Sequence, residues 1–279
     1  MENYQVKLHQ KIDITKDFDP DDYGDWKGKK EKGQEKLIEL QQELESLQQV
    51  LYAEHKHKIL IIIQAMDTAG KDGTIRSVFA GINPQGVHVA SFKVPTEIEN
   101  DHDFLWRVHP KVPGKGELVI FNRSHYEQVL VVRVHKIEPE KVWRRHYKQI
   151  NDFERLLTET GTTVIKFFLN IDLEEQKKRL LERIDIPEKQ WKFNVADIKE
   201  RGLWPQYMKA YSEAISVTST KEAPWHIIPA NHNWYRNLMV ATIIVEKLKS
   251  LEMQYPQTTA NLKECRAQLE AEGTISDKK

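Results

Sequence analysis

Residues 57–74 read HKILIIIQAMDTAGKDGT, and this stretch predicts the fold. Its first half contains the apolar run 59–63, in which apolar and polar side chains do not alternate. Such a run is typical of a strand that is buried on both faces of a parallel sheet. Its second half is a glycine-containing turn that leads into a helical pattern. A strand, a turn of this kind and a helix, in this order, predict a phosphate-binding loop of the Walker type.

Such a loop holds phosphate because its glycines let the backbone curl until several N–H groups converge on one anion. The helix that follows points its positive end at the same place, and Lys71 adds a mobile cation. The usual pattern GxxxxGK[ST] requires glycine at 65 and serine or threonine at 72, where this chain has Ala65 and Asp72. The alternative is therefore an ordinary turn between a strand and a helix, with a surface lysine and aspartate.

Asp67 lies inside this loop, where a carboxylate repels phosphate unless a cation intervenes. Mg²⁺ suits that position because it binds a few carboxylates together with phosphate oxygens and waters. The alternative is an aspartate that stabilises the turn by hydrogen bonds to nearby backbone.

Strand and helix patterns alternate along the rest of the chain, which predicts an α/β fold with a mostly parallel sheet flanked by helices. A further amphipathic helix is expected at 33–54, where leucines recur at steps of three and four. It either packs on its own domain or forms a subunit contact. The expected strands are 57–64, 87–92, 118–121, 163–169 and 225–229, and the other expected helices are 73–79, 101–108, 139–158, 173–184, 205–215 and 234–251.

The domain organisation follows from the same patterns. Residues 1–31 are polar and interrupted by Asp-Pro and glycine, so we expect an N-terminal arm. Residues 32–254 form the predicted P-loop kinase-like domain, with an inserted helical lid at about 172–203. Residues 255–279 form a polar C-terminal tail.

A second polar cluster follows the expected strand 118–121 and reads NRSHYE at 122–127. Ligands of parallel α/β sheets bind outside the carboxyl ends of the strands, so Arg123 and Glu127 should face the same crevice as the loop. Arginine is well shaped to hold phosphate oxygens at two points. A structural Arg–Glu pair is the alternative, and for His125 we favour packing or hydrogen bonding over metal binding.

The lid is unusually basic. Arg179 and Arg183 are four residues apart and should share a helix face, where an anion between them would offset their mutual repulsion. Lid arginines of this kind can contact the charge that develops on phosphate oxygens during phosphoryl transfer. A solvated charged face is the alternative. The basic residues are Lys177, Lys178, Arg179, Arg183, Lys189, Lys192, Lys199 and Arg201.

Composition bounds the remaining possibilities. Lys and Arg together number 42, as do Asp and Glu, so net charge gives no indication of a nucleic-acid or membrane partner. The single cysteine, Cys265, excludes a disulfide framework within the chain. The start of the chain lacks the apolar region of a signal peptide, and no apolar run is long enough to span a bilayer. We therefore expect a cytoplasmic protein.

Several motifs together resemble polyphosphate kinase family 2. Residues 67–74 resemble the family's DxxGKxG(T/S) variant of the Walker loop, which accounts for both departures from the usual pattern. Residues 122–127 resemble the second motif of the family in its class III form. The chain departs from the family at Gln128, Asn231 and Asn233. The resemblance spans residues 30 to 252 and continues through Gln176, Arg179, Leu180, Arg183, Pro187, Lys189, Trp191, Lys192, Arg201, Trp204, Tyr207, Tyr211, 218–220, 223–225 and 228–230.

The resemblance implies a P-loop kinase that transfers the terminal phosphoryl group of polyphosphate to AMP, to ADP or to both, with Mg²⁺ as cofactor and a homo-oligomer, a dimer or tetramer, as the assembly. An ATP-dependent nucleoside monophosphate kinase of the thymidylate-kinase type and a P-loop protein that binds nucleotides without turnover are the alternatives. The implied catalytic residues are Asp67, which also binds the metal, Lys71, Arg123 and Arg183. The implied nucleotide ligands are Asn122, Arg123, Glu127 and Arg183. The implied phosphate and polyphosphate ligands are Ala69, Gly70, Lys71, Asp72, Gly73, Thr74, Arg76, Arg133, Arg179, Lys189 and Lys192.

Overall fold

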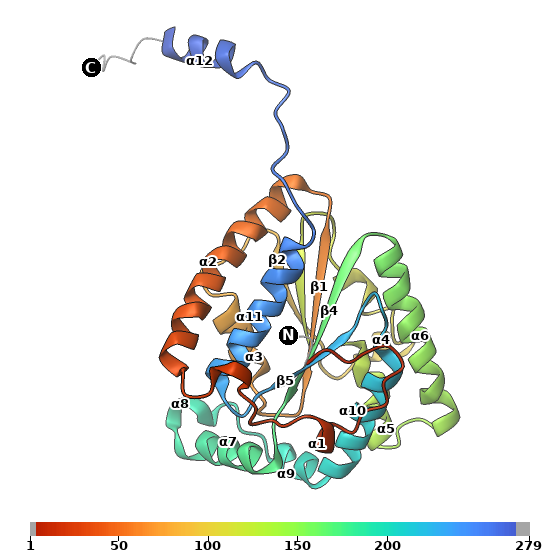
Figure 1. Cartoon of the computed structure of the whole chain (residues 1–279). Coiled ribbons are helices and arrows are strands. Elements are labelled where there is room, and N and C mark those ends of the chain that lie inside the picture. Colours follow the sequence, from red (N-terminus) through yellow and green to blue (C-terminus); the bar gives the residue numbers. More distant parts are fainter. Residues whose placement is uncertain (1–3, 272–279) are drawn as a thin grey trace, which may run out of the picture.

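The apolar run of residues 59–63 lies in the central strand of a five-stranded parallel sheet (Figure 1). The computed structural model describes residues 4–271. The strand order is β2-β3-β1-β4-β5, and Ile63 of β1 is paired with Asn122 on one side and Phe167 on the other. All five expected strands are confirmed, as β1 (Lys58–Ala65), β2 (Val87–Ser91), β3 (Leu118–Asn122), β4 (Thr162–Asn170) and β5 (Trp225–Pro229).

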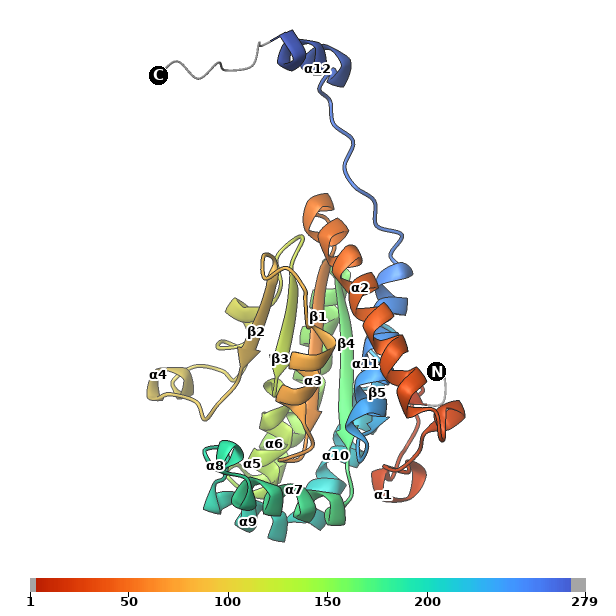
Figure 2. The same cartoon turned by 90° about the vertical axis from the view of Figure 1, so that its left-hand side faces the viewer.

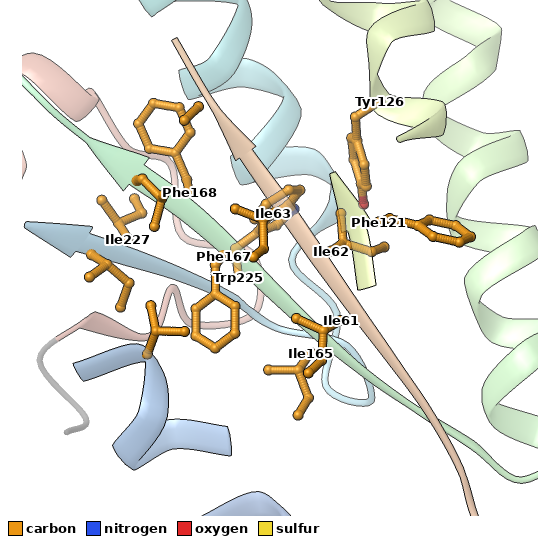
Figure 3. Packing of buried hydrophobic residues seen from close by; sticks show 14 of the residues in the cluster. Ile61, Ile62, Ile63, Phe121, Tyr126, Ile165, Phe167, Phe168, Trp225 and Ile227 are labelled. Carbon is orange, nitrogen blue, oxygen red and sulfur yellow. The ribbon is translucent and has the colours of Figure 1, made fainter. Parts of the chain in front are cut away.

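The central strands are buried on both faces, as their unbroken apolar sequences predict. Isoleucines of β1 pack beside the phenylalanines of β4 and the side chains of Phe121 and Trp225 (Figure 3). Complete burial of one such side chain stabilises the fold by about 1.5–3 kcal/mol. This packing holds the carboxyl ends of β1, β3 and β4 rigidly side by side.

Helices cover both faces of the sheet. The helices α2 (Lys30–Glu54), α3 (Lys71–Val78) and α11 (Asn233–Lys249) lie on one face, and α5 (Val131–Val134), α6 (Glu140–Glu159) and α10 (Trp204–Thr218) lie on the other (Figure 1). The leucine-rich helix expected at 33–54 is α2, which packs along α11 and buries Leu37, Leu40, Leu44 and Leu51. These leucines therefore pack on their own domain.

The prediction of a helix at 101–108 is wrong. Thr96 caps an earlier and shorter helix, α4 (Glu97–Asn100), through a capping box with Glu99. Residues 101–108 then form turns, because the Asp103 carboxylate accepts from the Leu105 N–H, at 2.9 Å, and competes with a helical bond. A short 3-10 helix, η3 (His109–Lys111), follows.

The lid consists of α7 (Leu173–Asp185), α8 (Pro187–Gln190) and α9 (Val195–Gly202). These helices come between β4 and β5 in the chain and lie below the carboxyl ends of the strands in Figure 2. A further 3-10 helix, η4 (His125–Val129), follows β3 at the same edge. The phosphate loop, the second polar cluster and the lid therefore share one end of the molecule.

The segments near the two ends of the chain differ in how they pack against the domain. Residues from 4 onward run along the outer edge of the sheet, where Val6 donates to the Trp225 carbonyl at 2.8 Å and α1 (Ile14–Asp17) lies near α10. A 3-10 turn, η2 (Gly24–Trp26), then leads towards α2. At the other end, the polar tail contains an exposed helix, α12 (Leu262–Ala271), that extends away from the sheet (Figure 1).

Residues 1–3 of the expected arm and 272–279 of the expected tail lie outside the described residues. Among the helices of residues 4–271, none combines the length and the apolar character that a membrane crossing requires.

Candidate active site

The phosphate loop lies between the end of β1 and the start of α3. Gly70 has φ 101°, a left-handed conformation that glycine adopts without strain, and Thr68 has φ 67°. The Thr74 N–H donates to the Gly70 carbonyl at 2.8 Å and closes the first helical turn. The N–H groups of residues 70–73 have no acceptor within residues 4–271 and are free for a ligand. The turn thus has the donor arrangement that the sequence predicts.

Lys71 folds back over the start of the loop. Its ammonium donates to the carbonyl of Ala65 at 3.0 Å and to that of Met66 at 3.3 Å. Burial lowers the pKa of Lys71, and the positive charge of Arg123 adds to this effect. The Lys71 ammonium is therefore held at the loop by neutral carbonyl groups, close to a second cation.

The second polar cluster meets the loop, as predicted. Arg123 donates to the Asp67 carboxylate at 2.8 Å and lies 3.9 Å from the carboxylate of Glu127. The Asn122 amide donates to the Asp72 carboxylate at 2.7 Å and forms a second link between the motifs. Burial raises the pKa of Glu127, against the opposing effects of Arg123 and Lys71.

Asp67 offers one carboxylate to a metal. Within residues 4–271, no three or more His, Cys, Asp or Glu side chains gather into a group that could hold a metal ion by themselves. This donor set fits Mg²⁺, which keeps several waters and binds through one or two carboxylates plus the phosphates of a substrate. It does not fit a structural ion that needs several protein ligands.

The two lid arginines do not enclose a shared anion site. All five N–H groups of Arg179 are engaged, one by Glu175 and four by the carbonyls of Thr68, Ala69, Ala230 and Asn231. The prediction of an anion bound between Arg179 and Arg183 is therefore wrong. Arg179 donates to carbonyl groups behind the loop and has no N–H left for phosphate.

Arg183 lies on the same helix, α7, but has different partners. It donates to the Asp197 carboxylate at 3.0 Å and to the Lys192 carbonyl at 3.3 Å. Burial raises the pKa of Asp197, and the negative charge of Asp67 adds to this effect. The Arg183–Asp197 pair is thus within electrostatic range of the loop.

The other basic residues expected at the site lie apart from the loop contacts. Lys189 pairs with Glu182 at 2.9 Å, and the Lys192 ammonium lies 5.0 Å from the centre of the Trp191 ring. Arg133 pairs with Glu213 of α10 at 2.7 Å. Arg76 is exposed on α3.

A pocket opens beside Glu127. It has a volume of about 450 Å³, which is within the range of small-molecule sites. Its walls come from the turns of residues 92–108, from η4 and from α6, and they include Phe104, Gln128 and His146. This wall is not predictable from the sequence pattern, because the periodicity of residues 101–108 predicts a regular helix and the structure has turns there.

Two buried cationic side chains were also missed. Arg236 of α11 donates to the Ala69 carbonyl at 2.9 Å, and a charged residue within the apolar helix pattern 234–251 was the available signal. Lys166 of β4 is fully buried and donates to Glu154 at 2.6 Å. Glu154 also accepts from Tyr126 at 2.7 Å, so this pair supports η4 from beneath.

Comparisons with known proteins give one consistent result. Residues 27–256 match the family model of polyphosphate kinase 2. The chain is 56% identical over 257 residues to the AMP/ADP-polyphosphate phosphotransferase of Meiothermus ruber, covering 92% of this chain and 96% of that protein. It is 47% identical over 228 residues to the ADP-polyphosphate phosphotransferase of Rhodopseudomonas palustris, covering 77% and 79%.

A solved structure is similar over nearly the whole fold. The crystal structure of polyphosphate kinase 2 from Arthrobacter aurescens superposes with a TM-score of 0.92 at 40% identity, covering 96% of this chain and 95% of that one.

Proposed function

This chain belongs to the polyphosphate kinase 2 family, and we propose that it transfers the terminal phosphoryl group of polyphosphate to both AMP and ADP. The observation that carries the proposal is the contact of Arg123 with Asp67 and its closeness to Glu127. It joins a loop with free N–H donors to a pocket of nucleotide size. The name of the Meiothermus ruber relative, which includes both acceptors, supports the same substrates.

The reaction is a direct in-line transfer. A phosphate oxygen of the nucleotide attacks the terminal phosphorus of polyphosphate and forms a new P–O bond. The bond from that phosphorus to its bridging oxygen breaks, and polyphosphate leaves one unit shorter with the bonding electron pair. Catalysis of this kind depends mainly on alignment and on neutralising the charge of the phosphate oxygens.

The loop and its neighbours supply that alignment. The N–H groups of residues 70–73 hold the phosphate chain, and Lys71 turns from the Ala65 and Met66 carbonyls to the phosphate oxygens. Arg123 bridges donor and acceptor phosphates, and Glu127 orients the nucleotide at the mouth of its pocket. Mg²⁺ bound at Asp67 would neutralise phosphate charge.

The lid completes the site when the substrates are bound. Arg183 exchanges its Asp197 partner for the oxygens of the transferred group, while Lys189 and Lys192 line the path of the polymer. Water is excluded as the lid closes. Arg179 acts from behind the loop and takes no part in direct phosphate contact.

The remaining assignments belong to the same proposal. Asn122 contributes to nucleotide binding through its link to Asp72, and Ala69 and Thr74 shape the loop. Arg76 and Arg133 bind more distant phosphates of the polymer. The proposed domains are the arm at 1–31, the kinase-like domain with its lid at 32–254 and the tail at 255–279. The proposed assembly is a cytoplasmic homo-oligomer, a dimer or tetramer.

The proposal is tested by incubating the purified protein with Mg²⁺, polyphosphate and AMP in the absence of ATP. Chromatography should detect ADP first and ATP later. Formation of ADP alone would restrict the acceptor to AMP. Absence of product here, together with transfer once ATP is supplied with another monophosphate, would contradict the proposal and support a conventional nucleoside monophosphate kinase.

A further inference from the structure

Arg236 is a buried cation with neutral partners. Arg236 is 2% exposed. Its guanidinium donates to the Ala69 carbonyl and to the amide oxygens of Asn233 and Asn237. Within residues 4–271, no carboxylate forms an ion pair with it. Burial, and then the charge of Arg179, lower the pKa of Arg236 to about 9. A buried guanidinium without a counter-charge is costly, so its presence requires a reason.

Two guanidinium groups converge on one carbonyl. The Ala69 oxygen accepts from Arg236 at 2.9 Å and from Arg179 at 3.1 Å. The same peptide unit carries the N–H of Gly70, one of the free donors of the phosphate loop. Donation to the carbonyl polarises the peptide and strengthens its N–H as a donor. The two arginines lie behind the loop, and through the Ala69–Gly70 peptide they strengthen an N–H donor on the side that faces the ligand.

The position of Gly70 shows how close the Arg236 guanidinium lies. A Cβ atom on Gly70 would be 2.1 Å from Nη1 of Arg236, and one on Gly73 would be 3.6 Å from Nη2. The guanidinium thus fills the space directly behind the first turn of α3. Only the backbone of the loop separates this buried charge from the free N–H groups of residues 70–73.

We propose that Arg236, together with Arg179, forms a buried cationic support that raises the affinity of the loop for the phosphate chain without touching it. This inference rests on the proposed function and names Arg236 as a positioning residue. An anion in the loop supplies the counter-charge that Arg236 otherwise lacks. Charge neutralisation then favours phosphate binding over binding of the less charged nucleoside part of the acceptor.

Direct binding measurements separate this role from simple packing of α11 against the loop. Calorimetry would compare the affinities for tripolyphosphate and for AMP in the unaltered chain and in Arg236→Met, Arg236→Gln and Arg236→Lys. Glutamine is the second neutral variant, because its amide can still donate to the Ala69 carbonyl. Lys247→Met is the matched control, because it removes an exposed positive charge from the same helix about 16 Å further along.

The neutral variants should weaken tripolyphosphate binding by roughly tenfold or more, because they remove a buried positive charge directly behind the loop, where charges interact more strongly than in water. AMP affinity should change by less than about threefold, because AMP carries less charge than tripolyphosphate and binds in the pocket beside Glu127 rather than in the loop. Arg236→Lys should retain most of the tripolyphosphate affinity, and Lys247→Met should match the unaltered chain.

Unchanged tripolyphosphate binding in the neutral variants would overturn the inference. Equal weakening of AMP and tripolyphosphate binding would also overturn it, since this would indicate a purely structural role. If the unaltered chain bound tripolyphosphate with the expected dependence on Arg236 but transferred no phosphate to AMP, the proposed function alone would be contradicted.

Discussion

Arg123 joins the two motifs of the site through an unusual backbone conformation. Its φ of 62° is left-handed, which costs a residue other than glycine about 1–2 kcal/mol. The conformation lets its N–H donate to the Ile63 carbonyl while its side chain reaches Asp67. Strain of this kind persists only where the surroundings enforce it, and here the strands β1 and β3 do so.

Removing the Arg183 guanidinium should slow turnover. Arg183→Ala should lower kcat by roughly a thousandfold or more, by analogy with arginines that stabilise the transition state of other phosphoryl transfers. Steady-state kinetics with saturating polyphosphate would measure the effect. Arg155→Ala, which removes an exposed arginine of α6, is the control. Near-normal turnover of Arg183→Ala would remove this residue from the transition state.

The activity should depend on pH through the ionisation of Glu127. Burial raises the pKa of Glu127, so its carboxylate takes up a proton at a higher pH than an ordinary glutamate. The ionised form is then lost as pH falls through this raised pKa. We expect an acidic limb of kcat/KM for AMP above the ordinary value of about 4.3, and we expect Glu127→Gln to lack it. An identical limb in Glu127→Gln would assign the titration to another group.

At the scale of elements, η4 depends on the buried pair beneath it. Lys166 donates to Glu154, to the Tyr126 hydroxyl and to the Thr218 carbonyl, and so links β4, α6, η4 and α10. The pair therefore ties the second motif to the core.

Lys166→Met should destabilise the protein by about 3–5 kcal/mol, because it leaves the Glu154 carboxylate buried without its main partner. Urea unfolding would measure the loss. The double variant Lys166→Met/Glu154→Gln should recover part of it, since no uncompensated charge remains. A double variant as unstable as the single one would show that packing, rather than the lost counter-charge, sets the cost.

The same pair should respond to acid. Burial alone would raise the pKa of Glu154, but Lys166 and His125 outweigh it and the pKa is lowered. A lowered folded-state pKa contributes stability that is present above the unfolded-state pKa, about 4.3, and is lost as pH falls through the folded-state value. The double variant should therefore lose less stability than the unaltered chain on acidification in this range.

The elements were predictable where one local signal dominated. The strands β1, β3 and β4 follow from apolar runs that fit a sheet covered on both faces. The prediction of a helix at 101–108 was wrong, because periodicity does not reveal that the Asp103 carboxylate accepts a hydrogen bond from the backbone of a turn. The meeting of Arg123 with Asp67 was predictable, since the carboxyl ends of neighbouring parallel strands share an edge.

Other parts of the site depended on long-range packing. Spacing places Arg179 and Arg183 on one helix, but it does not reveal that Arg179 meets the carbonyls of Ala69 and Ala230. Arg236 was missed for the same reason. Its partner Ala69 lies far away in sequence, and only the packing of α11 against α3 brings the two together.

At the scale of the molecule, the N-terminal arm and the loop belong to one network. The Pro20 carbonyl accepts from the Asn231 N–H at 3.2 Å, and the Asn231 carbonyl accepts from Arg179, which holds Ala69. Tyr4 also shares a hydrogen bond with Tyr235, the neighbour of Arg236, at 2.7 Å. The arm thus braces the support of the phosphate loop from outside the sheet.

The source of the transferred phosphoryl group is the central claim, and radiolabelled polyphosphate tests it most directly. The protein would be incubated with Mg²⁺, labelled polyphosphate and unlabelled AMP in the absence of ATP, and the nucleotides would then be separated. We predict label in ADP and then in ATP, and none in AMP. Unlabelled nucleotides in this reaction, together with labelled products when labelled ATP replaces polyphosphate, would contradict the account.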